Sequence, residues 1–108
     1  MPKSIEEIGL PPLTLDQIQS LCEIGETAAR KYIFSKVKRK RISDLNVTID
    51  IRRGRTLVVD VEVQLDLSPL VDIDAEILAE EAAKIALGAV EEKLREIACE
   101  SRKNTKVS

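Results

Sequence analysis

The sequence of 108 residues contains no histidine and no tryptophan, and Tyr32 and Phe34 are its only aromatic residues. Without histidine, the chain lacks the commonest general base and the imidazole ligands of many metal sites. Its two cysteines, Cys22 and Cys99, form no C-x-x-C pair, which argues against a structural zinc or iron–sulfur site. We therefore predict that the protein is not an enzyme and that it binds no cofactor, metal ion or small-molecule substrate.

Long hydrophobic runs are also missing. No apolar run approaches the length of about 18 residues that a transmembrane helix needs, and residues 1–12 lack the apolar segment of a signal peptide. We expect a cytoplasmic protein with no membrane partner. Cys22 and Cys99 are then interpreted as two small core residues, and the alternative is a disulfide, which the cytosolic proteins of hyperthermophiles use.

Charge is abundant and unevenly distributed. Charged residues make up 33% of the chain, which resembles thermophile proteins with many surface ion pairs, although the net charge is only −2. Residues 30–55 carry ten Lys or Arg and two Asp or Glu, whereas the rest of the chain carries seven and seventeen. This separation into a basic segment and an acidic remainder says more about partners than the total charge does.

The basic segment contains two clusters, one before the first expected strand and one at the tip of the expected hairpin. Clusters of Lys and Arg neutralise phosphates and give salt-dependent nucleic-acid binding. A strand of about eight residues would hold them roughly 25 Å apart, so they form two patches. Scarce aromatic residues argue against base stacking on the sheet, and a solvated surface or an acidic protein partner are the alternatives to RNA. The candidate nucleic-acid-binding residues are Lys36, Lys38, Arg39, Lys40, Arg41, Arg52, Arg53 and Arg55.

Apolar and polar residues alternate strictly over residues 44–67, which predicts an antiparallel β-hairpin with one aliphatic and one acidic face. The two aliphatic sets share a face when Ile51 lies opposite Leu57, and we expect a three- or five-residue loop centred near Gly54. In this register the second strand extends beyond the start of the first without a partner.

Two helices are predicted to flank the hairpin. The first runs over about residues 15–34 from a capping box that begins at Thr14, and the second runs from the N-cap residue Asp74 to about Cys99. Gly25 lies on the inner face of the first helix, where it indicates a close approach to the sheet or to another helix. Each helix has an apolar face at helical spacing. The faces comprise Ile18, Leu21, Cys22, Gly25, Ala28, Ala29 and Tyr32 in the first helix, and Leu78, Ala79, Ala82, Ala83, Ile85, Ala86, Ala89 and Val90 in the second.

The chain divides into an N-terminal arm (residues 1–13), a single domain (residues 14–100) and a flexible polar tail (residues 101–108). No clear strand precedes the first helix in the sequence: residues 5–10 are the only candidate, two adjacent glutamates break their alternation, and they remain open to a strand or a short helix. We predict an α+β fold: a two-layer α-β-β-α arrangement in which both helices cover the aliphatic face of the antiparallel hairpin.

A two-stranded hairpin is marginally stable alone, and open strand edges invite pairing with another chain. Aliphatic residues at the overhanging strand end and outside the main helical faces form a candidate contact surface, although scattered exposed aliphatic residues are also common. We therefore predict a homodimer, or a heterodimer with a paralogous small subunit. The partner-interface candidates are Leu65, Leu67, Ile77, Leu87 and Leu94.

Three stretches resemble a known family: A-R-K-Y-I-F-S-K at residues 29–36, L-D-L-S-P-L at residues 65–70, and the last helix, which is rich in Ala and Glu. They resemble a family of small archaeal proteins of unknown function, whose genes tend to lie beside that of the prefoldin beta subunit. That family is similar to the small dimerising subunit of KEOPS, the complex that makes threonylcarbamoyladenosine in transfer RNA. The resemblance implies a small sheet with two helices on one face, subunits that pair, and helices presented to a catalytic subunit; it implies no catalytic residues.

We therefore expect a non-catalytic small subunit that mediates protein–protein association, within a KEOPS-like tRNA-modification assembly. The alternative hypothesis is a module that binds RNA directly through the two basic patches.

Overall fold

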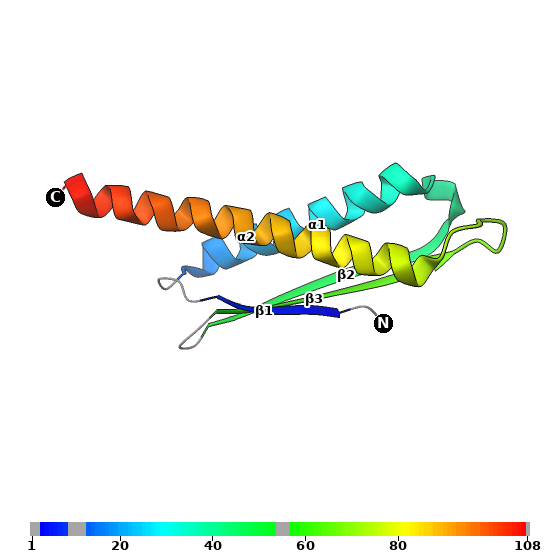
Figure 1. Ribbon diagram of the computed structural model, residues 1–108, viewed down its shortest axis with the longest axis horizontal. Coiled ribbons are helices and arrows are strands. Elements are labelled where there is room, and N and C mark those ends of the chain that lie inside the picture. Colours follow the sequence, from blue (N-terminus) through cyan, green and yellow to red (C-terminus); the bar gives the residue numbers. More distant parts are fainter. Residues whose placement is uncertain (1–2, 9–12, 54–56, 108) are drawn as a thin grey trace.

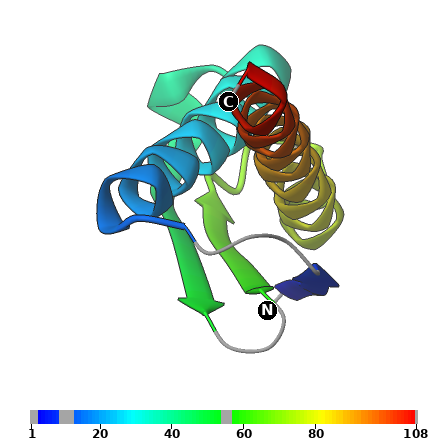
Figure 2. The same ribbon diagram turned by 90° about the vertical axis from the view of Figure 1, so that its left-hand side faces the viewer.

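The computed structural model describes residues 3–8, 13–53 and 57–107, of which 3–8 and 99–107 are described by their backbone. Both helices lie side by side on one face of an antiparallel sheet (Figure 1, Figure 2). The predicted α+β class, with two helices over one face of a β-hairpin, is confirmed. The elements are β1 (Lys3–Ile8), α1 (Leu15–Lys36), the 3₁₀ turn η1 (Arg39–Arg41), β2 (Ile42–Arg53), β3 (Leu57–Leu67) and α2 (Ala75–Val107).

Both helices begin where the capping residues predict. The Thr14 hydroxyl accepts a hydrogen bond from the Gln17 backbone N–H (3.1 Å), and the Gln17 side-chain carbonyl accepts one from the Thr14 N–H (2.9 Å). A carboxylate oxygen of Asp74 accepts hydrogen bonds from the backbone N–H groups of Glu76 (3.0 Å) and Ile77 (3.3 Å). These bonds satisfy N–H groups that have no partner within the helix, so the local sequence fixes both helix starts.

The end of α2 differs from the prediction. Its backbone stays helical to Val107, through the segment predicted as a polar tail from residue 101. After Gly88 the sequence contains no further glycine or proline, so no residue stops the helix at residue 100. Within the described residues, no helix is long and apolar enough to cross a membrane.

Lys3–Ile8, in the N-terminal arm that the sequence left open to a strand or a short helix, forms the third strand of the sheet. This strand, β1, runs antiparallel to β3, with Lys3 opposite Glu62 and Ile8 opposite Leu57, and the strand order is β1-β3-β2. An edge strand tolerates charged residues that break the alternation, because charges there discourage pairing with other chains. The two adjacent glutamates were therefore a poor argument against a strand.

The hairpin pairs with a different register from the one predicted. Ile51 lies opposite Val59 rather than Leu57, and Leu57 lies opposite Arg53. A shift of two residues keeps every side chain on its own face, so the alternation favours both registers equally. The observed register corresponds to the shorter of the two expected loops, and Gly54 lies outside the described residues.

The predicted overhang of β3 is also wrong. Leu65 lies opposite Leu45, and Leu67 lies opposite Ile42. β2 begins at Ile42, earlier than the alternation suggested. An irregularity between Ile42 and Asp44 leaves one extra residue of β2 without a partner in β3. The hairpin strands therefore match in length.

The core is aliphatic and lies between the helices and the sheet. The predicted inner faces are largely correct, but Ile33 and Leu94 are buried and Ile85 is 44% exposed, contrary to prediction. The buried side of α2 recurs every four residues, which brings Leu94 inward. The buried apolar residues are Leu13, Leu21, Ala29, Ile33, Val37, Ile51, Leu57, Val59, Val61, Val63, Leu78, Ala79, Ala82, Ala83, Ala86, Val90 and Leu94.

Gly25 is the point where α1 comes closest to its neighbours, as the sequence predicts. A Cβ atom added at this position would collide with the end of Ile49 from β2 and would lie only 3.0 Å from Cγ2 of Val90 in α2. Gly88 on α2 is the opposite case, because an added Cβ would meet nothing within 4 Å.

These two glycines give a matched pair of stability variants. We expect Gly88→Ala to raise the free energy of unfolding by about 0.5–1 kcal/mol, because alanine favours the helix and meets open space. Gly25→Ala should raise it less than Gly88→Ala does, or lower it, because the end of Ile49 and Cγ2 of Val90 must move to admit the methyl group. Urea unfolding followed by circular dichroism measures both; equal effects of the two substitutions would contradict the close approach at Gly25.

Candidate functional site

Exposed aliphatic side chains gather around the start of α2. Ile73 is 42% exposed, Ile77 55% and Ile85 44%, and Leu70 in the preceding turn is 81% exposed. Ile77 and Ile85 are eight residues apart on the helix, which places them on one side of it. We call Ile73, Ile77 and Ile85 the aliphatic stripe.

A shallow hollow of about 380 Å³ lies beside the stripe, between the end of α1 and the start of α2. Ile73 and Ile77 line it together with Tyr32, whose hydroxyl donates a hydrogen bond to the Glu81 carboxylate. That bond raises the pKa of the Tyr32 phenol above its usual value, so the phenol keeps its proton and remains a donor. The ammonium group of Lys36 lies 5.6 Å from the centre of the Tyr32 ring. The two helices are therefore tied together where the stripe begins.

A groove follows the stripe along the solvent-facing side of the helical layer. Ile24, Ala28 and Lys31 line it from α1, and Ala89 and Lys93 line it from α2. Its side chains are small or half-buried in the middle and charged at the rim. Such a surface can receive the ridge of another helix.

The predicted partner-interface residues behave differently from one another. Ile77 is exposed, as an interface residue must be in the free subunit, whereas Leu94 is only 1% exposed and belongs to the core. Leu65, Leu67 and Leu87 are half-buried and pack against the core. Their burial by the chain itself leaves Ile77 as the one candidate on the solvent side.

Sequence reasoning missed Ile73 and placed Ile85 on the buried face. The spacing of Ile73, Ile77 and Ile85 is a multiple of four, which is the signal that could have identified the stripe. That signal was weak because it lies beside the stronger alanine-rich face of the same helix.

The first basic cluster is exposed at one end of the molecule. Lys36, Lys38, Arg39, Lys40 and Arg41 are all exposed, in the last turn of α1 and in η1. The Arg39 guanidinium lies 4.6 Å from the centre of the Phe34 ring, and the Arg41 carbonyl accepts a hydrogen bond from the Ser68 N–H (2.8 Å). These contacts hold the basic turn in place.

The second basic cluster is largely engaged within the fold. Arg53 donates a hydrogen bond to the Leu13 carbonyl (2.8 Å), and the Arg52 guanidinium lies 3.5 Å from the Asp50 carboxylate. Arg55 lies outside the described residues. The 12-residue strand β2 separates the clusters by about 40 Å, so the structure does not bring them together.

Cys22 is a free, half-buried thiol in the structure, and the Cys99 side chain lies outside the described part. The Cys22 thiol donates to the Ile49 carbonyl (3.6 Å). Burial and, second, the charge of Asp50 raise its pKa, which makes it a poor nucleophile. Among the described side chains, no group of three or more Cys, Asp or Glu is placed to hold a metal ion.

Comparisons with known sequences identify relatives over nearly the whole chain. The family model described as "Protein of unknown function (DUF3194)" matches residues 10–93. An uncharacterised protein of Thermococcus kodakarensis is 40% identical over 100 residues, which cover 93% of this chain and 93% of that protein. An uncharacterised protein of Pyrococcus furiosus is 38% identical over 98 residues, which cover 91% of this chain and 88% of that protein.

Two solved structures are similar to this one. A crystal structure from Thermococcus onnurineus NA1 has a TM-score of 0.74 and 37% identity, covering 91% of this chain and 95% of that one. The solution structure of a hypothetical protein from Methanothermobacter thermautotrophicus has a TM-score of 0.69 and 25% identity, covering 82% and 96%. The chain therefore belongs to the DUF3194 family of archaeal proteins of unknown function.

Proposed function

We propose that this protein is a non-catalytic, cytoplasmic small subunit that pairs with a second small subunit, either its own copy or a paralogous chain. The observation that carries the proposal is the aliphatic stripe of Ile73, Ile77 and Ile85 on the solvent-facing side of the helical layer. Single exposed aliphatic residues need no explanation, but a group of them indicates an interaction site.

The shape of this side supports packing against another helix. Gly88 and Ala89 of α2, with Ala28 of α1, present little side-chain bulk beside the stripe. Helices that pack through small residues approach to about 8–10 Å, and Ile77 and Ile85 are spaced as anchors for such a contact. Full burial of an isoleucine side chain contributes about 1.5–3 kcal/mol, and these half-exposed residues would contribute a part of that.

The resemblance to the KEOPS small subunit suggests the setting. It implies a small sheet with two helices on one face, and β1 supplies a strand that the sequence did not predict. In a KEOPS-like tRNA-modification assembly, the helices would also be the side presented to a larger subunit. The position of the stripe on the helical layer supports this arrangement.

We expect the purified protein to sediment above its monomer mass of 12.0 kDa at micromolar concentration. Ile77→Gln should weaken association at least about tenfold, because it removes an apolar anchor from the contact. The free energy of unfolding should change by less than about 1 kcal/mol, because Ile77 is 55% exposed. Sedimentation equilibrium of both proteins measures the effect.

Leu15→Gln is the matched control, because Leu15 is 72% exposed at the start of α1, away from the stripe. Gly88→Gln tests the same contact without loss of apolar surface, since the added side chain meets open space within the subunit. Two results together would argue against the proposal. They are a wild-type protein that sediments as a monomer, and affinity purification from the host that retains the same proteins with the wild type and with the Ile77→Gln variant.

The exposed basic turn favours RNA binding as a second candidate function. Five basic side chains lie together there, and none of them forms an ion pair with a carboxylate of the described residues. This candidate uses the first cluster alone, since Arg52 and Arg53 are engaged elsewhere.

If the five basic residues contact five phosphates, log K against log salt should fall with a slope of about −3.5 to −4.5. Charge reversal at Lys38, Lys40 and Arg41 should abolish binding, whereas reversal of Lys84 on α2 should leave it unchanged. Fluorescence anisotropy with a labelled single-stranded RNA measures both. Affinity that does not respond to salt would eliminate this function.

A further inference from the structure

One edge of β3 is covered along only part of its length. β1 pairs with β3 from Leu57 to Glu62, where Lys3 is the last described partner, whereas β2 pairs along the whole of β3. In the described part of the chain, no strand lies beside Val63–Leu67 on the β1 side. Among the described residues, this segment is an open strand edge in line with β1.

The backbone N–H and C=O groups of alternate residues in this segment, Val63 and Leu65, point to the open side. The Ser68 N–H donates to the Arg41 carbonyl (2.8 Å), which lies on the β2 side of the hairpin. Backbone N–H and C=O groups of successive strand residues point alternately to the two sides. Those of Val63 and Leu65 therefore point away from β2, toward the space that β1 leaves uncovered. They form a template for another strand.

A contact at the far edge of β2 agrees with this assignment. Ile49 lies opposite Val61, and its carbonyl accepts a hydrogen bond from the Cys22 thiol of α1. The odd-numbered residues of the hairpin therefore turn their backbone groups outward on both strands.

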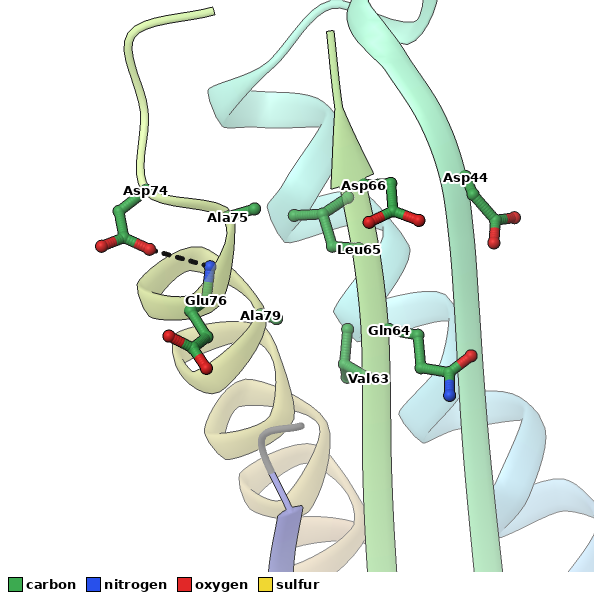
Figure 3. Close-up of a pocket in the computed structure, with 9 residues that line it drawn as sticks. All are labelled: Asp44, Val63, Gln64, Leu65, Asp66, Asp74, Ala75, Glu76 and Ala79. Atoms are coloured by element: carbon green, nitrogen blue, oxygen red, sulfur yellow. Dashed lines mark hydrogen bonds between the residues drawn. The ribbon is translucent and has the colours of Figure 1, made fainter. Parts of the chain in front are cut away.

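A hollow of about 520 Å³ lies at this edge, between the end of β3 and the first turns of α2 (Figure 3). Val63 and Leu65 line it from β3, and the small side chains of Ala75 and Ala79 line it from α2. Because these helix residues are small, the first turns of α2 leave room for backbone beside β3. We call this site the β3 notch.

The lining of the notch is strongly acidic. Asp44, Asp66, Asp74 and Glu76 line it, all four are exposed, and no Lys or Arg does so among the described residues. Asp44 and Asp66 lie directly opposite each other in the hairpin, where like charges destabilise a sheet. None of the four forms an ion pair with a described Lys or Arg. A cationic partner would relieve this repulsion.

We propose that the β3 notch binds an extended basic segment of another protein by strand addition. The open backbone groups of Val63 and Leu65 would pair with the added strand, as in other sheet-edge peptide complexes. Side chains of the added strand alternate between faces. Small aliphatic side chains would lie against Val63, Leu65 and α2, and the intervening Lys or Arg side chains would lie on the opposite face, where Asp66 and Asp44 project (Figure 3). The segment that fits is one in which basic and small aliphatic residues alternate.

The test uses the full-length protein and a seven-residue peptide that alternates lysine with valine. Titration calorimetry gives the affinity, and amide exchange by NMR locates the contact. We expect the N–H groups of Val63 and Leu65 to become at least about tenfold more protected. A peptide with proline in place of each valine has the same charge but lacks the N–H groups that would face β3, and it should bind at least about tenfold more weakly.

Protein variants give a second measure. Asp66→Asn should weaken peptide binding about two- to fivefold, the scale of exposed ion pairs, whereas Glu92→Gln on α2 should not. Ala75→Met should block the notch and weaken binding at least about tenfold. Ile77→Gln should leave peptide affinity unchanged, which separates this inference from the proposed helical contact.

Three outcomes would overturn the proposal. The proline peptide could bind as tightly as the valine peptide, which would indicate charge attraction alone. Val63 and Leu65 could remain unprotected when the peptide is bound. Finally, Ala75→Met could dissociate a dimer of the protein, which would assign the notch to a second copy of the chain.

Discussion

The arrangement of this protein depends on the close approach of α1 to both the sheet and α2 at Gly25. No side chain separates the helix from Ile49 and Val90 there, so the methyl groups of those residues fill the space. Leu21 and Ala29, one turn to either side, are completely buried. A core without buried aromatic residues can be thin, and a thin core keeps both helices close to the sheet over their shared length.

That thin core determines which surfaces remain available. α1 lies mainly over β2, and α2 lies mainly over β3, so both helices are used to cover one face of a narrow sheet. The helices then have a solvent side on which Ile77 and Ile85 are exposed, and the sheet has a second face that carries acidic residues. Nothing in the chain's own packing accounts for the exposed isoleucines, which is why they carry the functional proposal.

Local signals in the sequence predicted the parts of the fold that depend on neighbouring residues. The capping box at Thr14, the N-cap at Asp74 and the alternation in the hairpin each involve residues within a few positions of one another. The register of the hairpin could not be predicted in this way, because a shift of two residues preserves the alternation and the pattern fits both registers equally.

The candidate site was predicted less well than the fold. Ile85 was expected in the core and Leu94 at an interface, but the structure leaves Ile85 44% exposed and buries Leu94. A helical wheel assumes one buried direction, but α2 packs against β3 and α1 at once, and its buried residues Leu78, Ala82, Ala86, Val90 and Leu94 follow a row of four-residue steps. Because four residues make slightly more than one helical turn, such a row winds slowly around the helix, whereas a helical wheel assumes that one side stays buried. The edge of β3 was invisible to the sequence because it depends on where β1 stops.

The features that could bind a partner converge on one end of the molecule. The basic turn η1 contacts the chain just after β3 through the Ser68–Arg41 hydrogen bond, and the first turn of α2 follows six residues later. Ile73, just before α2, and Ile77, in its first turn, line the hollow on one side, while Asp74 and Glu76 line the β3 notch on the other.

The opposite end of the molecule is organised differently. There Arg53 is committed to the Leu13 carbonyl and Arg52 to Asp50, so the charges serve the fold. A partner that approaches the first turn of α2 can bury aliphatic surface and meet unpaired carboxylates within one interface, and a partner at the described part of the hairpin tip can do neither. Apolar contact supplies affinity and charge supplies specificity in such interfaces, so this end is where both the helical contact and the strand-addition site place recognition.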